Sequence, residues 1–251
     1  INKIYLWPTE IKKTYLGSTL IYDKTAPTNW LLNNLVSYYK MDTSWSFPDA
    51  HGSNNGTINW ASYTASWKIN WGYSFDWSND FIDLNTNFIP SWQQSYYSFW
   101  VYPTDLSGWD TFSTSNPRNI LWQNSSSSPF IRLLWTRLNV GVYNWSYLET
   151  RTTQSFTTGE WQFVEVLITP SSTTKVWRNW VLLSNDTNAT FPATWTNWTQ
   201  DIWRNSFTWN IRHYNWVLDE MWIWNNFNPT DIQRNQLYNS WAWLSYDDFT
   251  T

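Results

Sequence analysis

The sequence predicts an all-β sandwich, because three features of the chain agree on that class. Short runs rich in β-branched and aromatic residues recur at regular intervals from Leu35 onward. Clusters of Asn, Asp, Ser, Gly and Pro separate these runs, and no alternating helical segments lie between them. The chain has 251 residues, of which 42% are hydrophobic, so it is long enough to bury one large core.

The N-terminal part predicts a small β module, because it contains an internal repeat. The segment Lys3–Ile11 is echoed by Lys13–Ile21, and each copy alternates β-forming residues before a turn. We therefore expect a hairpin-like module at residues 1–24 and a linker at 25–34, where Pro27 lies. The sandwich then spans residues 35–245, and residues 246–251 form a tail.

The predicted strands of the sandwich follow one another with polar turns between them. They are Val36–Met41, Tyr73–Phe75, Phe81–Leu84, Tyr96–Val101, Phe130–Leu134, Asn139–Tyr143, Trp161–Thr169, Lys175–Leu183 and Leu218–Trp224. One short helix is expected late in the chain, because Pro229-Thr230-Asp231 is typical of a cap and Ile232–Tyr238 has helical spacing.

Several of these segments also match a known family in sequence and in order. The matching pieces are Leu35–Asp42, Asp49–Thr57, Tyr73–Ile82, Tyr97–Pro103, Thr158–Trp161, Lys175–Val181, Leu218–Asn225 and Pro229–Asn239. Together they resemble the laminin-G-like domains of the concanavalin A-like lectin/glucanase superfamily. The resemblance implies a concanavalin A-like jelly-roll β-sandwich.

The glycine and tryptophan contents are unusual for a protein of many turns. The chain has 7 Gly and 25 Trp, although turns favour residues that accept positive φ. Within the internal repeat Trp7 aligns with Gly17, and the family pattern places glycine where this chain has other tryptophans. These are Trp77, Trp180, Trp203 and Trp216, together with Trp60, Trp67 and Trp71 in a loop that is normally rich in glycine.

Two explanations of this bias stay open. We hypothesise that the gene uses UGA for glycine and that the printed sequence reads this codon as tryptophan. The alternative is a surface rich in genuine tryptophan that binds a ligand. UGG codons at Trp7, Trp77 and Trp180 would rule out the first explanation.

The family resemblance also implies a structural calcium ion. In such domains the ion lies between an early loop that contains Asp and an Asp on a late strand. The matching residues here are Asp42, Asp49 and Asp219, with Asn54 or Asn55 as a further oxygen donor. In the alternative interpretation Asp49 forms an ordinary turn and Asp42 caps a strand.

Catalysis is not expected from this sequence. Related glucanases carry two Glu residues that flank an Asp on one strand, at a spacing that points all three into one cleft. The chain has no such motif, and its nearest acidic pair, Asp219-Glu220, is adjacent, so we expect the two side chains on opposite faces of a sheet. Neither His51 nor His213 lies in a nucleophile motif.

Charge and composition limit the partners. The net charge is −4 and the 15 basic residues are scattered, which argues against nucleic acid. No apolar run approaches the roughly 20 residues of a membrane span. Candidate sugar-stacking aromatics are abundant, such as Tyr143, Trp145 and Tyr147 with Arg151, but most aromatics of a sandwich are core residues, so no sugar site is assigned.

The resemblance therefore implies a non-catalytic recognition or adhesion module, with a glycan or a surface protein as partner. The repeat at residues 1–24 resembles short β-segments that precede laminin-G-like domains in bacteriophage structural and adhesion proteins. An extracellular or virion surface is the expected location. The alternatives are a structural virion protein, such as a fibre or decoration protein that packs against other virion subunits without binding sugar, and a glycoside hydrolase whose site is not recognised.

Overall fold

The structure is a computed structural model, and it describes most of the chain. The described residues are 5–6, 9–10, 13–16, 19–23, 29–65, 68–69, 71–75, 80–86, 88, 93–104, 118–123, 127–134, 136–144, 147–170, 172–186, 200–202 and 216–238. Trp7, Trp67, Trp77, Trp203, Trp145 and the predicted tail at 246–251 lie outside them.

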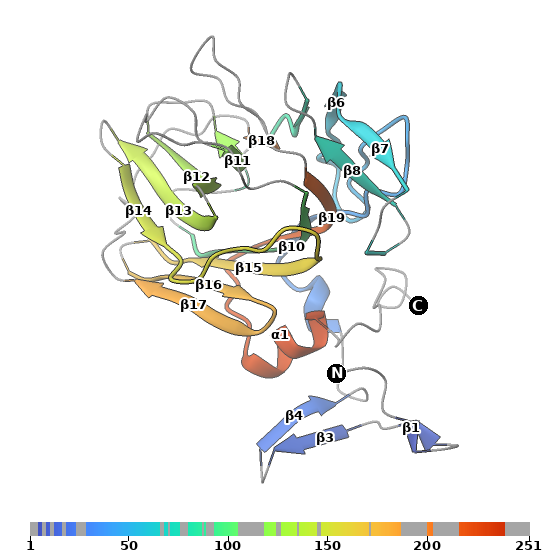
Figure 1. Ribbon diagram of the computed structural model, residues 1–251, viewed down its shortest axis with the longest axis vertical. Helices are drawn as coiled ribbons and strands as arrows, with labels where there is room; N and C mark the ends of the chain where they lie inside the picture. The colour runs from blue at the N-terminus through green and yellow to red at the C-terminus, as the bar shows by residue number, and fades with distance from the viewer. Residues whose placement is uncertain are drawn as a thin grey trace.

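Two antiparallel sheets face each other and form the body of the molecule (Figure 1). The back sheet has the strand order β17 (Val181–Asp186), β16 (Thr174–Arg178), β15 (Gln162–Ile168), β10 (Ser95–Pro103), β19 (Trp216–Asn225), β8 (Gly72–Phe75) and β7 (Ser62–Thr64), and β5 (Leu35–Tyr39) also pairs with β19. The front sheet has the order β14 (Tyr147–Arg151), β13 (Arg137–Asn144), β12 (Ser127–Leu134), β11 (Arg118–Gln123), β18 (Gln200–Ile202), β9 (Phe81–Asp83) and β6 (Thr57–Asn59). The predicted all-β sandwich is confirmed.

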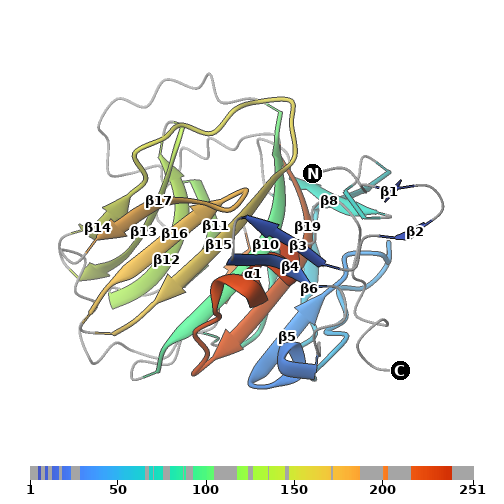
Figure 2. The ribbon, with the colours of Figure 1, turned by 90° about the horizontal axis from the view of Figure 1, so that it is seen from below.

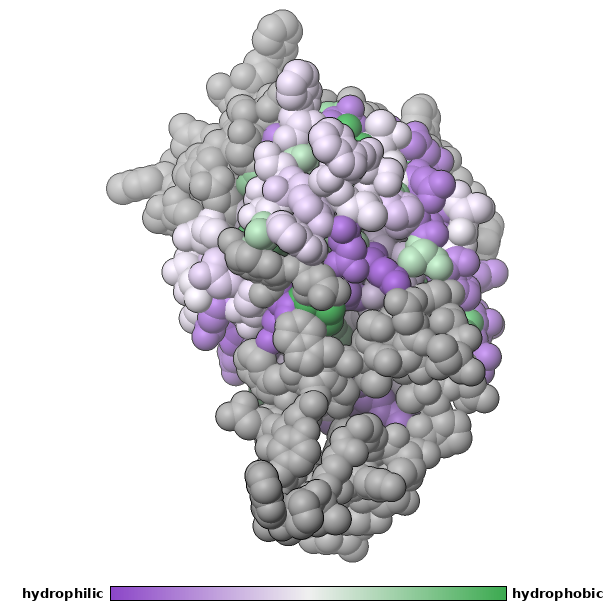
Figure 3. All heavy atoms as spheres, turned by 90° about the vertical axis from the view of Figure 1, so that its right-hand side faces the viewer, coloured by the Kyte–Doolittle hydropathy of each residue, from purple (hydrophilic) through white to green (hydrophobic). Residues whose placement is uncertain are grey.

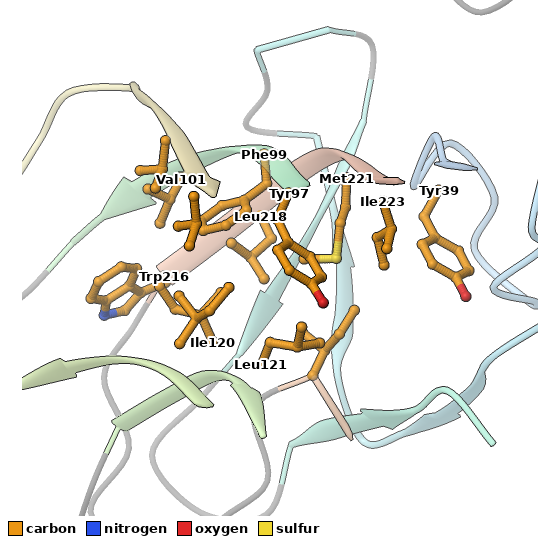
Figure 4. Packing of buried hydrophobic residues seen from close by; sticks show 14 of the residues in the cluster. Tyr39, Tyr97, Phe99, Val101, Ile120, Leu121, Trp216, Leu218, Met221 and Ile223 are labelled. Carbon is orange, nitrogen blue, oxygen red and sulfur yellow. The ribbon is translucent and has the colours of Figure 1, made fainter. Parts of the chain in front are cut away.

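The hydrophobic core lies between the two sheets (Figure 4). Alternate residues of β10 and β19 point into it, as the period of two along a strand requires. From the opposite side β11 contributes Ile120 and Leu121. This core fixes which face of every strand is internal, and so which side chains of the front sheet face outward.

A second, smaller cluster covers the outer face of the back sheet, where η1 (Asn29–Leu32) and α1 (Asp231–Tyr238) lie (Figure 2). The indole N–H of Trp224 donates to the carbonyl of Leu31 at 2.7 Å, and that of Trp30 donates to Gln236 at 2.8 Å. These two bonds connect η1 to β19 and to α1. The back sheet is therefore buried on both faces where α1 crosses it.

A buried ion pair holds α1 on the sheet. Arg234 of α1 reaches Glu165 of β15 at 3.4 Å, and its guanidinium lies 4.2 Å from the centre of the Trp177 ring. The hydroxyl of Tyr96 also donates to Glu165. Burial raises the pKa of Glu165 to about 7, because the effect of leaving water exceeds the opposing effect of Arg234.

The N-terminus of α1 is stabilised by a reciprocal cap. The N–H of Gln233 donates to Thr230 Oγ1 at 3.3 Å, and the N–H of Thr230 donates to Gln233 Oε1 at 2.8 Å. Thr-x-x-Gln is the sequence of a capping box, which satisfies two backbone donors at once. The helix predicted over Ile232–Tyr238 is confirmed, and it begins one residue earlier, at Asp231.

The internal repeat forms two separate hairpins. β1 (Tyr5–Leu6) pairs with β2 (Thr9–Glu10), and β3 (Lys13–Leu16) pairs with β4 (Thr19–Asp23). The backbone of β4 lies against α1 (Figure 2). The division of the chain into residues 1–24, 25–34, 35–245 and 246–251 stays a prediction.

One predicted strand is two strands in the structure. The segment Lys175–Leu183 was expected to be continuous, but it turns back between Arg178 and Val181, which pair across β16 and β17. The two residues between them, Asn179 and Trp180, have φ values of 45° and 79°. A two-residue hairpin loop with positive φ at both positions is a type I′ turn, for which Asn-Gly is the preferred sequence.

The tryptophans suspected of replacing glycine therefore behave differently from one another. Trp180 and Trp60 have positive φ, with 64° at Trp60, a conformation that costs a bulky residue energy. Trp216 instead begins β19 and is fully buried in the core. The backbone supports displaced glycine at positions 60 and 180 and gives no such support at 216.

No helix within the described residues has the length and apolarity to cross a membrane.

We predict that Trp180→Gly is more stable than Trp180→Ala by about 1 kcal/mol. Both variants lose the ring contact with Tyr238, so their difference isolates the backbone, where only glycine avoids the penalty of positive φ. At Trp177, in the strand before the turn, we expect the opposite order, because glycine is roughly 0.5–1 kcal/mol worse than alanine in a strand. Urea unfolding of the four variants checks this, and Trp180→Ala equal to or above Trp180→Gly would contradict it.

A second prediction concerns pH. The folded pKa of Glu165, about 7, lies above its ordinary value of 4.5, so the folded state binds this proton more tightly than the unfolded chain. The resulting stabilisation is fully present at pH values below the ordinary pKa of 4.5, and it is lost as the pH rises through 7. The melting temperature should therefore fall by a few degrees between about pH 5 and 8.

Glu165→Gln should flatten this slope, whatever its effect on absolute stability. Thermal melts at several pH values check this. A wild-type melting temperature that rises over the same range, or a slope unchanged in Glu165→Gln, would contradict the account.

Candidate functional site

Asp49 organises the loop that follows β5. Its buried carboxylate accepts five hydrogen bonds of 2.7–3.1 Å, from Ser37 Oγ and from the backbone N–H groups of Tyr38, His51, Gly52 and Asn54. Burial alone would raise the pKa of Asp49, but these bonds, led by that of Gly52, hold it below its ordinary value. The carboxylate therefore stays ionised and its oxygens are fully used by the protein.

The neighbouring residues fit this role. A Cβ on Gly52 would lie 2.6 Å from Asp49 Oδ2 and 2.7 Å from the carbonyl oxygen of Val36, so only glycine fits at this position. Asn55 accepts the N–H of Asp49 at 2.9 Å, and Asn54 donates to Ser37 at 2.8 Å. Both asparagines expected near a calcium ion are used to hold the loop.

Asp42 and Asp219 belong to a different cluster, on the outer side of β19. Asp219 is fully buried, and its Oδ2 accepts the N–H of Ile69 at 2.7 Å and that of Lys68 at 3.3 Å. Burial raises the pKa of Asp219 well above its ordinary value, and the nearby carboxylate of Asp42 raises it further. The neutral form of Asp219 is therefore favoured relative to that of an exposed carboxyl group.

A β-bulge brings Glu220 to the same face as Asp219. Ser98 pairs with Trp222 and Trp100 with Asp219, so two residues of β19 oppose one of β10, and Glu220 has a φ of 53°. Leu218 and Met221 point into the core between the sheets. Glu220 accepts the hydroxyl of Tyr38, which stacks on Trp222 in the outer cluster.

The expectation that adjacent Asp219 and Glu220 face opposite sides is therefore wrong, because the bulge interrupts the period of two. The two carboxyl groups lie near enough for Asp219 to raise the pKa of Glu220, after burial itself. Both side chains are nevertheless enclosed, so no sugar ring reaches them in this structure. The pair is a buried acid cluster and not an open cleft.

The three calcium candidates do not come together. Within the part of the chain that the structure describes, no group of three or more acidic, His or Cys side chains is placed to hold a metal ion. Asp49 has its oxygens occupied by its own loop, whereas calcium takes six to eight oxygen ligands. Asp49 and Asp219 thus lie in separate hydrogen-bond networks, and calcium binding at Asp42, Asp49 and Asp219 stays a prediction.

Three exposed tryptophans of the described residues lie next to β6–β8 in the sequence, and Figure 3 views the side of the molecule where these strands lie. They are Trp45, Trp60 and Trp71, and Trp71 stacks on Tyr63 with ring centres 4.9 Å apart. Trp60 is 74% exposed at a position whose φ favours glycine. Exposure of Trp60 is therefore expected from the displaced-glycine hypothesis and is weak evidence for a sugar-stacking surface.

A polar network on the front sheet does not depend on any tryptophan. Ile131, Leu133, Leu138 and Val140 point into the core, so the residues that alternate with them point outward. The strand registers place Arg132, Asn139 and Arg151 side by side in one row across β12, β13 and β14. The next row contains Phe130, Gly141 and Glu149.

Glu149 joins the two arginines of this network. It lies 2.5 Å from Arg132 and 3.1 Å from Arg151. Arg132 starts two strands away and stacks on Phe130, with its guanidinium 4.5 Å from the ring centre. Gly141 has no side chain between Phe130 and Glu149, which leaves room for Arg132 to cross β13.

The network is buried at one end and open at the other. The side chains of Arg132 and Glu149 are 5% and 16% exposed, and that of Arg151 is 35% exposed. Burial alone would raise the pKa of Glu149, but Arg132 above all, with Asn139 and Arg151, holds it below its ordinary value. Two guanidinium groups therefore surround one ionised carboxylate, and the open end lies on β14, the edge strand of the front sheet.

Sequence reasoning identified Arg151 only as a residue near candidate aromatics. It missed Arg132, Asn139 and Glu149, because separate strands bring them together and no spacing in the sequence marks them. The side chains of Tyr143 and Tyr147 are outside the described part of the structure.

Comparison with solved structures assigns the fold. The binding domain of Paraclostridial Mosquitocidal Protein 1 superposes with a TM-score of 0.69 at 13% identity, over 84% of this chain and 53% of that one. Domain 4 of AbnA, an extracellular arabinanase from Geobacillus stearothermophilus in complex with arabinotriose, gives a TM-score of 0.63 at 18% identity, over 82% of this chain and 98% of that domain. This chain has the concanavalin A-like lectin fold.

A botulinum neurotoxin DC binding domain in complex with rat synaptotagmin II has the same concanavalin A-like arrangement, with a TM-score of 0.64 at 13% identity, over 85% of this chain and 53% of that one. The chain spans about half the length of these toxin domains. No protein-family model and no curated protein matches the sequence. The predicted jelly-roll class is confirmed, and the neighbours described here are binding domains.

We predict that Asp49→Ala lowers the free energy of unfolding by about 3 kcal/mol, because it leaves several buried donors without an acceptor. Asp83→Ala is the matched control, since the carboxylate of Asp83 accepts the N–H of Asn85 at an exposed position. That control should cost roughly 1 kcal/mol or less. Chemical denaturation compares the two, and equal losses would contradict the central role of Asp49.

Proposed function

We propose that this chain is a non-catalytic recognition module that binds a glycan on an extracellular surface. The observation that carries the proposal is the match to the arabinotriose-bound domain, of which the chain covers 98%. The Arg132–Glu149–Arg151 network adds suitable chemistry, because it offers donors and acceptors at an open sheet edge. The location and the adhesive role rest on the same similarity.

A surface protein is the second candidate partner. The synaptotagmin complex shows that a domain of this fold is found with a protein ligand. The structural role on a virion and the glycosidase activity have no comparable observation in their favour. The experiment below is designed to distinguish these two roles from glycan binding.

The test is binding of the purified chain to a glycan array, followed by competition with the free sugar. Saturable binding that free sugar displaces supports the proposal, with arabinotriose as the first soluble probe. Attachment to cells or particles that no free sugar displaces would indicate a protein partner or a structural role and overturn the glycan proposal. If the chain hydrolyses a polysaccharide and Asp219→Asn abolishes this activity, the proposal that the module is non-catalytic is overturned.

A further inference from the structure

Two arginines share one carboxylate in the Arg132–Glu149–Arg151 network. Burial alone would raise the pKa of Glu149, but the arginines, Arg132 above all, hold it below its ordinary value. Arg132 contacts Glu149 at the buried end of the network, and Arg151 contacts it at the exposed end. The guanidinium of Arg151 is therefore the positive group of the network that a ligand can reach.

Arg151 also has donors to spare. A guanidinium has five N–H donors in a planar fork, and the bond from Arg151 to Glu149 at 3.1 Å uses one of them. The Arg151 side chain is 35% exposed, so part of the guanidinium group is accessible to solvent. A planar fork of this kind matches a carboxylate through two parallel hydrogen bonds.

The inner part of the network fixes the position of Glu149. Arg132 and Asn139 are almost completely buried, and Arg132 is stacked on Phe130. The Asn139 amide lies beside Glu149 and helps to lower its pKa. Neither polar atom of the Asn139 side chain meets the geometry of a hydrogen bond with a partner among the described residues. Glu149 and Arg151 are thus presented by a rigid support rather than by a mobile loop.

We propose that this network is a subsite for a carboxylated saccharide, with Arg151 bound to the carboxylate and Glu149 accepting from a neighbouring sugar hydroxyl. The inference rests on the proposed glycan-binding function and adds the class of sugar. A neutral sugar would use the donors and acceptors but not the positive charge of Arg151. Nucleic acid is not the expected ligand, because the 15 basic residues of the chain are scattered.

The experiment is a calorimetric titration of the full chain with trigalacturonate and with its carboxyl-reduced counterpart. The two ligands differ only in the carboxyl groups. We expect the acidic trisaccharide to bind roughly 10- to 100-fold more tightly, the range of one charge-assisted pair. We also expect this preference to weaken at high salt.

Two variants and one control complete the test. Arg151→Ala should remove the preference for the acidic ligand, and Arg151→Lys should restore only part of it, because an ammonium group lacks the fork. Arg137→Ala, an exposed arginine at the start of β13, should leave both affinities unchanged. Melting temperatures establish that all three variants are folded.

The outcomes separate this inference from the proposed function. Equal affinity for the two ligands, or an acid preference that survives in Arg151→Ala, would overturn the carboxylate subsite while glycan binding itself stands. Absence of binding to every glycan on the array would overturn the proposed function as well.

Discussion

The strand β19 is the element on which the architecture depends. It pairs with β10 for most of its length and also with β8 and β5. One face contributes Leu218, Met221 and Ile223 to the core between the sheets, and the other contributes Trp222 and Trp224 to the cluster under η1 and α1. Because it is buried on both faces, polar residues within it need internal partners. The bulge at Glu220 meets this demand, since it brings Glu220 to the face of Asp219. There Tyr38 donates to Glu220, and the N–H groups of Lys68 and Ile69 donate to Asp219.

The fold class could be predicted from the sequence because alternation along a strand is a local property. The long strands and α1 were recognised from their own residues, including the Thr230–Gln233 cap. The hairpin between β16 and β17 was missed for an equally local reason. Asn-Gly would have marked the turn, but the sequence shows Asn179-Trp180, which reads as part of a continuous strand. The positive φ of Trp180 shows that the backbone turns at this position.

The candidate site could not be predicted in the same way. Arg132, Asn139 and Arg151 become neighbours only through the registers of three strands, and register is a long-range property. The calcium candidates show that residues which match a family in sequence order need not share one site in the structure. Asp42, Asp49 and Asp219 follow a family order in the sequence, yet Asp49 accepts five hydrogen bonds from β5 and its own loop. Asp219 instead accepts the N–H groups of Lys68 and Ile69 in a separate cluster. The order of residues in the sequence is therefore a poor predictor of contacts that depend on backbone geometry.

We propose that this concanavalin A-like chain binds its ligand on the front sheet at β12–β14 and not on the exposed tryptophans beside β6–β8. Chemical-shift mapping by NMR of the full chain, titrated with a saccharide that it binds, tests this most directly. The account predicts that the largest shifts lie at Glu149, Arg151 and the adjoining strands, including the Arg151 Nε–H signal. Shifts confined to Trp45, Trp60 and Trp71, with the front sheet unchanged, would contradict it.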